Sequence, residues 1–506
     1  MRPSLFALGH DVSPPKVSPW RSFRDWAKEE IVLRKLDTPL GYLFMVLVGL
    51  FISHQIGRYG WEAAKVLFTG IVLIPGLLIA LFHTRFGLYL MLAFSTCLVL
   101  IERLGLNLPL DIFLDVGIWM LLFGMLVQTS FRVPKRPYIS WIGGMLLLWT
   151  AYCLLEWLNP WTPTQASWIY AVREIGEYPL IFFAGLYGLK EVKHIRRLAH
   201  IWLGLATLVG SYGLIQATLG FSAFELEWLL SDYANYESIF TEKRLRTFSI
   251  LQDPGTFGIF MGHSALLGLI ILLKTSSNWP KKVLLAGAVG VMLVAMVLSG
   301  TRTTFVMTAA SFAFIMWVSL NRRIWLTGGI LATLLVGVYF LGPVNNPHVQ
   351  RIRSAFAPQQ ASSFQVRMEN QAYVQPFILD HPIGGGIGST GKWGKKFSPH
   401  TLLSQFPPDS GYVQIAVETG WVGLILYLSL MLVIVTSGVK SYFRCKSPEL
   451  RPYALGFLAV IFALMIANYP QPALFQHPNG LMFFLAAAAL VRLKRIALES
   501  EAATPA

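Results

Sequence analysis

The stretch "PPDSGYVQIAVETGWVGLILYLSLMLVIV", residues 407–435, decides the fold class. Its second half is an unbroken apolar run, long enough with its flanks to cross a hydrocarbon core of roughly 30 Å as a helix. Its first half carries a set of polar side chains: Asp409, Ser410, Tyr412, Gln414, Glu418 and Thr419. Lipid offers the backbone no hydrogen-bond partners, so a helix is the natural form for the run. The stretch therefore predicts a membrane-spanning helix with polar chemistry at one end.

Similar apolar runs recur along the whole chain of 506 residues, which is 55% hydrophobic and only 13% charged. Soluble proteins carry about 25% charged residues. We therefore predict an all-α polytopic membrane protein with 12 to 14 transmembrane helices. The fourteen runs lie near 39–56, 63–83, 86–103, 109–130, 138–157, 167–188, 198–220, 255–274, 282–299, 302–320, 324–342, 409–436, 452–468 and 478–491.

The net charge of +15 is explained by topology and not by nucleic acid. With the N-terminus placed in the cytoplasm, 27 of the 41 Lys and Arg residues fall on the cytoplasmic side. Cytoplasmic loops carry such an excess, so both termini are expected in the cytoplasm. The resulting organisation is a cytoplasmic tail (1–38), a transmembrane region (39–342) with an external loop (221–254), a long external loop (343–408) between the eleventh and twelfth spans, a second transmembrane region (409–491) and a cytoplasmic tail (492–506).

Several arginines are predicted to face outside, so the excess of positive charge in cytoplasmic loops does not explain them. Arg244 and Arg246 precede the eighth span in "EKRLRTFSILQDPGTFG", Arg302 lies in the short turn "LSGTRTTF", and Arg367 lies in "FQVRMEN". An arginine binds phosphate through a planar bidentate fork and keeps its charge. The set predicts an anionic lipid-linked ligand such as a lipid diphosphate. The alternative is contact with ordinary lipid head groups.

The sixth predicted span contains charges within its apolar run. Arg173 and Glu177 lie four residues apart, so they can pair on one helix face. A charge inside a membrane is costly and is often functional. The pair could instead lock the helix bundle.

Metal and nucleotide cofactors are not expected. Histidines are few and show no metal-ligand spacing. The Gly-rich segment 386–391, "GIGSTG", fits a dinucleotide fingerprint by letter, but that fingerprint needs a preceding strand in a cytosolic βαβ unit. Its glycines are better explained by tight turns or close approach. His400 stands out because it lies nine residues before Asp409.

Five segments in order resemble the bacterial O-antigen ligase and O-antigen/exopolysaccharide polymerase superfamily. They are "RTFSILQDPGTFG", "LSGTRTTF", "VRMENQAYVQPFILDHPIGGGIGS", the long external loop, and "DSGYVQIAVETGWVGLILYL". Ser249 stands where the family usually has Gly. Ligases of this family tend to carry His followed by Asn or Ser where this chain has Asp409 and Ser410, and an Asp there is more typical of polymerases.

The resemblance implies a metal-independent glycosyltransferase of the C type in the bacterial inner membrane. Its donor would be an undecaprenyl diphosphate-linked glycan. By this resemblance Arg246, Arg302 and Arg367 are candidate diphosphate ligands, with Arg173 as a loose fit. Asp409 and His400 compete as the catalytic base.

The resemblance favours polymerisation of lipid-linked units into O-antigen or exopolysaccharide at the outer face of the membrane. The alternative is ligation of the glycan to lipid A-core, and a second is transport of lipid-linked glycans. Expected partners are the lipid-linked glycan, a glycan acceptor, the bilayer and other polysaccharide-assembly proteins, but no nucleic acid.

Overall fold

The computed structural model describes residues 38–60, 70, 74–104, 110–130, 140–231, 236, 239–241, 244–274, 278–357 and 362–503. The predicted tail 1–38, except for its last residue, and much of the predicted span 63–83 lie outside these residues. The chain divides into two units, 1–72 and 73–506. The first contributes helix α2 (Pro39–Tyr59), and every other labelled element belongs to the second.

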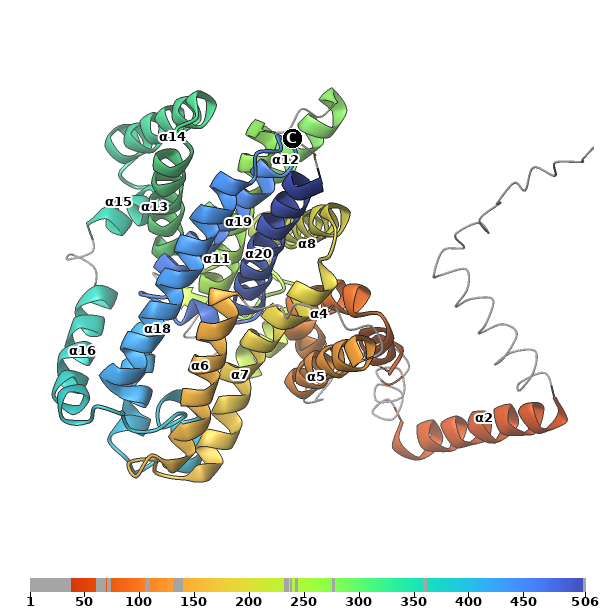
Figure 1. The fold of residues 1–506 in the computed structure, drawn as a ribbon. Coiled ribbons are helices and arrows are strands. Elements are labelled where there is room, and N and C mark those ends of the chain that lie inside the picture. The colour runs from red at the N-terminus through yellow and green to blue at the C-terminus, as the bar shows by residue number, and fades with distance from the viewer. Residues whose placement is uncertain are drawn as a thin grey trace, which may run out of the picture. The chain divides into compact units, whose positions relative to one another are not determined.

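Helices dominate the second unit (Figure 1). The long ones are α4 (Thr84–Arg103), α5 (Leu110–Ser130), α6 (Trp141–Leu155), α7 (Gln165–Gly188), α8 (Val192–Leu219), α11 (Pro254–Lys274), α12 (Trp279–Leu298), α13 (Arg302–Ser319), α14 (Arg322–Leu341), α16 (Ser362–Asp380), α18 (Gly411–Arg444), α19 (Arg451–Ala467) and α20 (Asn479–Ala503). The short ones are α9 (Ala223–Ser231), α15 (Pro347–Phe356), α17 (Gly391–Phe397) and the 3₁₀ turns η2 (Glu156–Leu158), η4 (Leu403–Gln405) and η5 (Ala473–Phe475). The all-α prediction missed one small antiparallel pair, β1 (Phe240–Thr241) with β2 (Arg244–Leu245).

Nine helices in the described residues are long and apolar enough to cross a membrane. They are α2, α4, α5, α6 with η2, α8, α11, α12, α14 and α18. Helices α7, α13, α19 and α20 occupy four more predicted spans but are shorter or less apolar. The chain is a polytopic helical membrane protein, and the count of fourteen stays a prediction.

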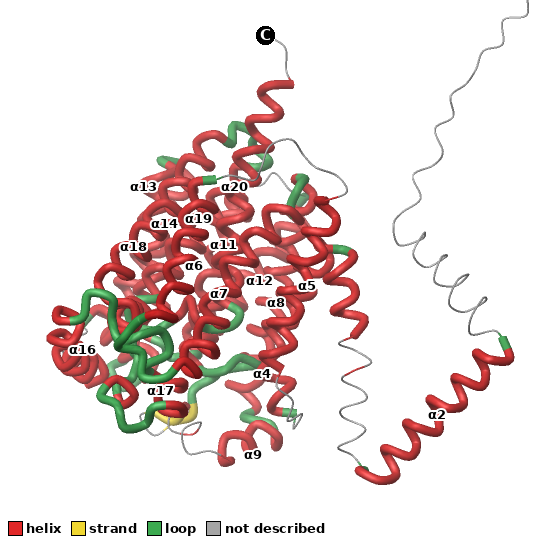
Figure 2. Tube along the Cα trace, turned by 60° about the horizontal axis from the view of Figure 1, so that its bottom comes forward, coloured by secondary structure: helices red, strands yellow, loops and turns green. Residues whose placement is uncertain are grey.

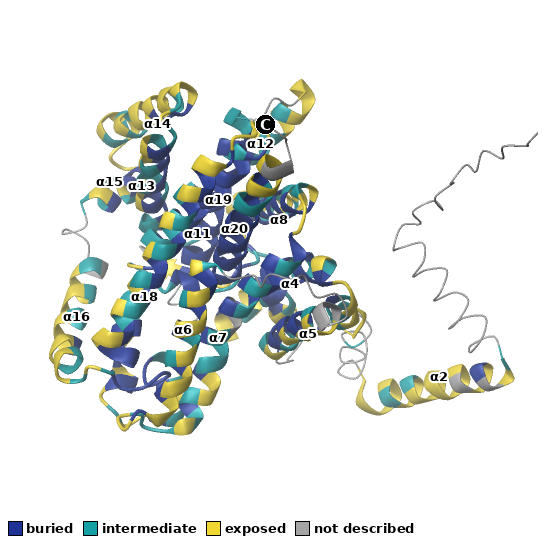
Figure 3. Cartoon of the chain, viewed as in Figure 1, coloured by how far each residue is buried: buried dark blue, intermediate teal, exposed yellow. Residues whose placement is uncertain are grey.

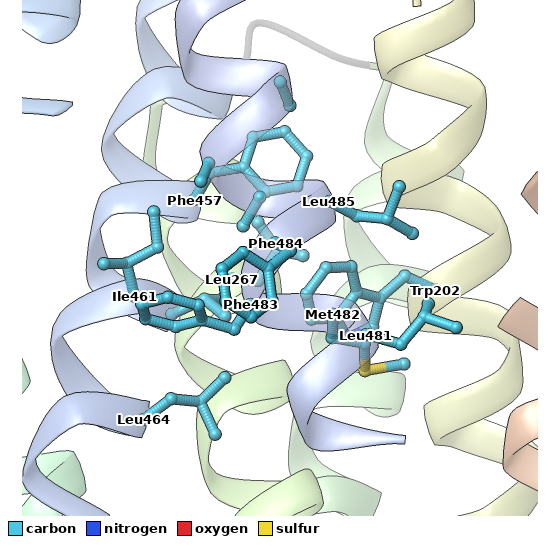
Figure 4. Packing of buried hydrophobic residues seen from close by; sticks show 14 of the residues in the cluster. Trp202, Leu267, Phe457, Ile461, Leu464, Leu481, Met482, Phe483, Phe484 and Leu485 are labelled. Atoms are coloured by element: carbon cyan, nitrogen blue, oxygen red, sulfur yellow. The ribbon is translucent and has the colours of Figure 1, made fainter. Parts of the chain in front are cut away.

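The buried centre of the second unit consists of α11, α19 and α20 (Figure 3). Apolar side chains from α8, α11, α19 and α20 meet there, among them Trp202, Leu267, Phe457 and Phe483 (Figure 4). The indole nitrogen of Trp202 donates a 3.0 Å hydrogen bond to the hydroxyl of Ser264, so its polar atom is satisfied within the core. Helix α14, in contrast, exposes most of its apolar surface, as a lipid-facing helix would.

Contacts near the two ends of the helices join segments that were predicted to share a side of the membrane. On the predicted cytoplasmic side, Lys446 pairs with Glu501 at 2.9 Å, and Arg196 pairs with Glu449. On the predicted outer side, the loops gather between α16 and α17 (Figure 2). Which of these sides faces the cytoplasm stays a prediction.

Helix α18 is interrupted at Gly420, and the Gly-rich loop docks into the break. Gly420 has φ of +68°, and a Cβ there would lie 2.0 Å from the carbonyl oxygen of Pro382. The amide of Val422 donates to that same oxygen at 3.2 Å, and the amide of Gly385 donates to the carbonyl of Val417 at 2.9 Å. Only glycine fits this position, because it tolerates positive φ and has no side chain. Gly420 therefore opens the helix for the loop.

Glu418 anchors the same loop from within α18. Its side chain is buried and accepts hydrogen bonds from Thr390 Oγ1 at 2.5 Å and Gln414 Nε2 at 3.4 Å. A Cβ at Gly386 would lie 2.2 Å from Thr162 Oγ1, so this glycine of "GIGSTG" is required by close approach to the protein itself. Gln414 and Glu418 therefore stabilise the position of the Gly-rich outer loop.

Candidate active site

A cavity of about 480 Å³ opens where α13, α15, α16 and α18 meet the loop after α19. Its apolar lining includes Val306, Ala355, Phe364, Phe462, Met465, Ile466 and Pro470. Its polar lining consists of Arg302, Thr303, Ser354, Arg367, Tyr412 and Tyr469. Ligand pockets are typically concave and mostly apolar, with a few convergent polar groups. Two cations on such a wall match a ligand with an anionic head and an apolar body.

Arg302 enters this cavity from the first position of α13. The preceding turn is fixed by Arg246, whose Nε donates to the carbonyl of Ser299 at 3.0 Å and whose Nη2 donates to Thr301 Oγ1 at 2.6 Å. Thr301 in turn donates to the carbonyl of Pro254 at 2.8 Å. The positive end of the α13 dipole adds to the attraction for an anion. Arg246 is therefore placed to orient the turn that carries Arg302.

Arg367 reaches the cavity from α16. The second half of α16 is held on α18 by a small apolar cluster that includes Val374, Phe406 and Val417. Burial lowers the pKa of the Arg367 guanidinium; Asp409 opposes this shift, and Arg302 adds to it. Asp409 and Arg302 therefore each lie within electrostatic reach of Arg367.

Asp409 lies directly before α18, at the edge of this group. Its Oδ2 accepts a hydrogen bond from Asn370 Nδ2 of α16 at 3.1 Å. Ser410 caps α18 by accepting from the amide of Val413, and Tyr412, in the first turn of the helix, lines the cavity. The carboxylate thus contacts α16 from a position two residues before the start of α18.

His400 does not share this position. It is exposed in the turn after α17, and the residues that line the cavity in the described part of the chain do not include it. The structure therefore associates Asp409, and not His400, with Arg367.

Arg173 also lies outside the lining described above. Arg173 forms an ion pair at 2.9 Å with Asp115 of α5, whereas pairing with Glu177 was predicted. The side chains of Glu177 and Arg244 lie outside the described residues. The next residue of α7, Glu174, pairs with Lys392 of α17 at 2.6 Å, which ties the outer loop to the bundle. Arg173 thus serves an α5–α7 contact, in keeping with the locking role.

Sequence reasoning missed Phe364, Tyr469 and Asn370. Phe364 and Tyr469 line the cavity, and Asn370 contacts the Asp409 carboxylate. One signal was available: Phe364, Arg367 and Asn370 recur every three residues, which places them on one face of a helix. Tyr469 carried no such signal, because only the fold brings the loop after α19 to this place.

No group of three or more His, Cys, Asp or Glu side chains in the described ranges could hold a metal ion. The expectation of metal-independent chemistry stays a prediction.

Residues 287–428 match the family model described as O-antigen ligase. This match supports the O-antigen ligase and polymerase superfamily for the region 287–428. No curated protein matches the chain. The matched O-antigen ligase region runs from α12 into α18 and contains Arg302, Arg367, His400 and Asp409, whereas Arg173, Arg244 and Arg246 precede it. The family indicates O-antigen ligase-type activity and a glycosyltransferase-like enzyme in a membrane.

Proposed function

We propose that the protein transfers a glycan from undecaprenyl diphosphate to an acceptor hydroxyl at the outer face of the bacterial inner membrane. The observation that carries this proposal is the cavity that joins Arg302 and Arg367 to a wall of apolar side chains. The two guanidinium groups fit the diphosphate, because each can form a bidentate charge-assisted contact. Val306, Phe364 and Ile466 fit the first isoprenoid units.

The reaction requires one bond to form and one to break at the anomeric carbon. The acceptor hydroxyl oxygen attacks that carbon, the bond to the diphosphate oxygen breaks, and its electron pair leaves with undecaprenyl diphosphate. Fixed arginines stabilise the charge that grows on the leaving diphosphate. A single displacement of this kind inverts the anomeric centre.

The hydroxyl proton passes to a base, and we assign this role to Asp409. The carboxylate contacts Asn370, which follows Arg367 by three residues on α16, so a diphosphate held by that arginine would bring the glycosidic bond close to it. Proton transfer to a positioned carboxylate typically contributes about 10²–10⁴-fold. Neither Asp409 nor His400 is among the residues that line the cavity, but Asp409 contacts Asn370 of α16, whereas His400 is exposed in the turn after α17.

Two acceptors are consistent with this site. Asp409 and Ser410 resemble the polymerase pattern, which favours a second lipid-linked glycan and hence polymerisation into O-antigen or exopolysaccharide. The family description, O-antigen ligase, favours lipid A-core instead. We place polymerisation first because an Asp at position 409 is more typical of polymerases than of ligases.

Glycan analysis of a strain that lacks the gene separates the candidates. Loss of all long chains indicates a polymerase, and long chains that remain on undecaprenyl diphosphate indicate a ligase. A second experiment uses purified protein in detergent with lipid-linked glycan extracted from the deletion strain. A transferase makes new glycosidic bonds there, whereas a transporter makes none, and that result would overturn the proposal.

A further inference from the structure

Asn370 contacts the proposed base from the helix that carries one of the proposed diphosphate ligands. Its Nδ2 lies 3.1 Å from Oδ2 of Asp409. An ionised carboxylate can only accept hydrogen bonds, so the amide must present its nitrogen and not its oxygen. The contact therefore fixes the orientation of the Asn370 amide and engages Oδ2 of the Asp409 carboxylate.

Asn370 follows Arg367 by three residues on α16, so both side chains lie on one face of the helix. Three residues correspond to a rise of about 4.5 Å along the axis. The second half of α16 is fixed on α18 by the apolar cluster around Val374 and Val417. A single anchored helix thus sets the spacing between the diphosphate contact and the carboxylate.

We propose that Asn370 is a positioning residue that holds Oδ2 of Asp409 and thereby turns Oδ1 toward the acceptor hydroxyl. The inference rests on the proposed function, because it requires Asp409 to receive the acceptor proton. Asn370 itself touches neither the diphosphate nor the reacting atoms. Its removal should therefore impair turnover and leave donor binding intact.

The first measurement compares kcat with binding of undecaprenyl diphosphate, a probe that lacks the glycan. We expect Asn370→Ala to bind the probe as the wild type does and to lose up to about 10²-fold in kcat, which is the typical effect of a 1 Å misplacement. Asn370→Gln keeps an amide donor on a longer stem and should recover part of kcat. Glu369→Ala, an exposed change on the same helix, is the matched control and should behave as the wild type.

A double-mutant cycle with Asp409→Ala tests whether Asn370 acts through the carboxylate. Residues that act as a unit give non-additive losses, so Asn370→Ala should have almost no further effect when Asp409 is already Ala. Thermal unfolding of each variant checks that the fold is kept. If thermal unfolding shows that Asn370→Ala does not fold, Asn370→Gln replaces it in the double-mutant cycle.

Three outcomes would overturn the inference: wild-type kcat in Asn370→Ala, multiplicative losses in the cycle, or a parallel loss of undecaprenyl diphosphate binding. Failure of the proposed donor site looks different. There, Arg302→Ala would bind undecaprenyl diphosphate as tightly as the wild type, while the coupling between Asn370 and Asp409 would still be measured. Full turnover in Asp409→Ala would remove the positioning role and leave the donor site standing.

Discussion

Replacement of Arg302 by alanine should abolish most turnover, because this side chain joins the cavity wall at the first position of α13. A bidentate contact to phosphate comprises two charge-assisted hydrogen bonds, each worth about 1.5–3 kcal/mol. Their loss removes about 3–6 kcal/mol. We therefore expect kcat/KM to fall by about 10²–10⁴-fold, since each 1.4 kcal/mol corresponds to a factor of ten. Arg302→Lys keeps a point charge without the fork and should lose about 10–10²-fold.

The assay is glycan transfer by purified protein with extracted lipid-linked donor, together with direct binding of undecaprenyl diphosphate. Lys395→Ala is the control, because it removes an exposed cation from the same predicted external loop without touching the cavity lining. Equal thermal unfolding of the variants shows that the fold is kept. Transfer and binding at wild-type level in Arg302→Ala would refute the assignment of this arginine to the diphosphate.

Three further predictions concern the supports of the site. Arg246→Ala should lower transfer together with undecaprenyl diphosphate affinity, because the turn before Arg302 loses two hydrogen bonds; unchanged binding would show that the turn holds without it. Gly420→Ala should destabilise the protein by more than about 2 kcal/mol. A positive φ alone costs about 1–2 kcal/mol for alanine, and the added Cβ would collide with the carbonyl oxygen of Pro382. A thermal midpoint equal to that of the wild type would contradict this. His400→Ala should keep transfer within about twofold in the same assay, because the removed side chain is exposed and does not line the cavity. A loss of transfer near about 10²-fold, as expected when a general base is removed, would instead make His400 the base.

The spans could be predicted from sequence because lipid imposes one simple requirement, a long apolar helix, on each of them. Arg302 and Arg367 could be chosen because a cation at an outer turn has few other reasons to be there. The ion pair between Arg173 and Asp115 could not be predicted, because Asp115 lies on another helix. Local spacing points only to Glu177, four residues after Arg173 on the same helix. Tyr469 joins the site through contacts between segments far apart in the chain, which no local pattern encodes. The three-residue spacing places Asn370 with Arg367, but it does not encode the contact of Asn370 with Asp409.

Gly420 shows the same limit in the backbone. The letters "ETGWVG" inside an apolar run predict a continuous helix, and glycine there suggests close packing. The break exists because the loop at Pro382 supplies hydrogen-bond partners that replace those of the helix. Only a contact across the fold makes the interruption stable.

The central claim, that Arg302 and Arg367 hold a lipid diphosphate in the cavity, is tested most directly by electron cryomicroscopy with bound undecaprenyl diphosphate. The account predicts diphosphate density between the two guanidinium groups and isoprenoid density along Val306, Phe364 and Ile466. Diphosphate density at another place on the protein, with this cavity left empty at saturating ligand, would contradict it.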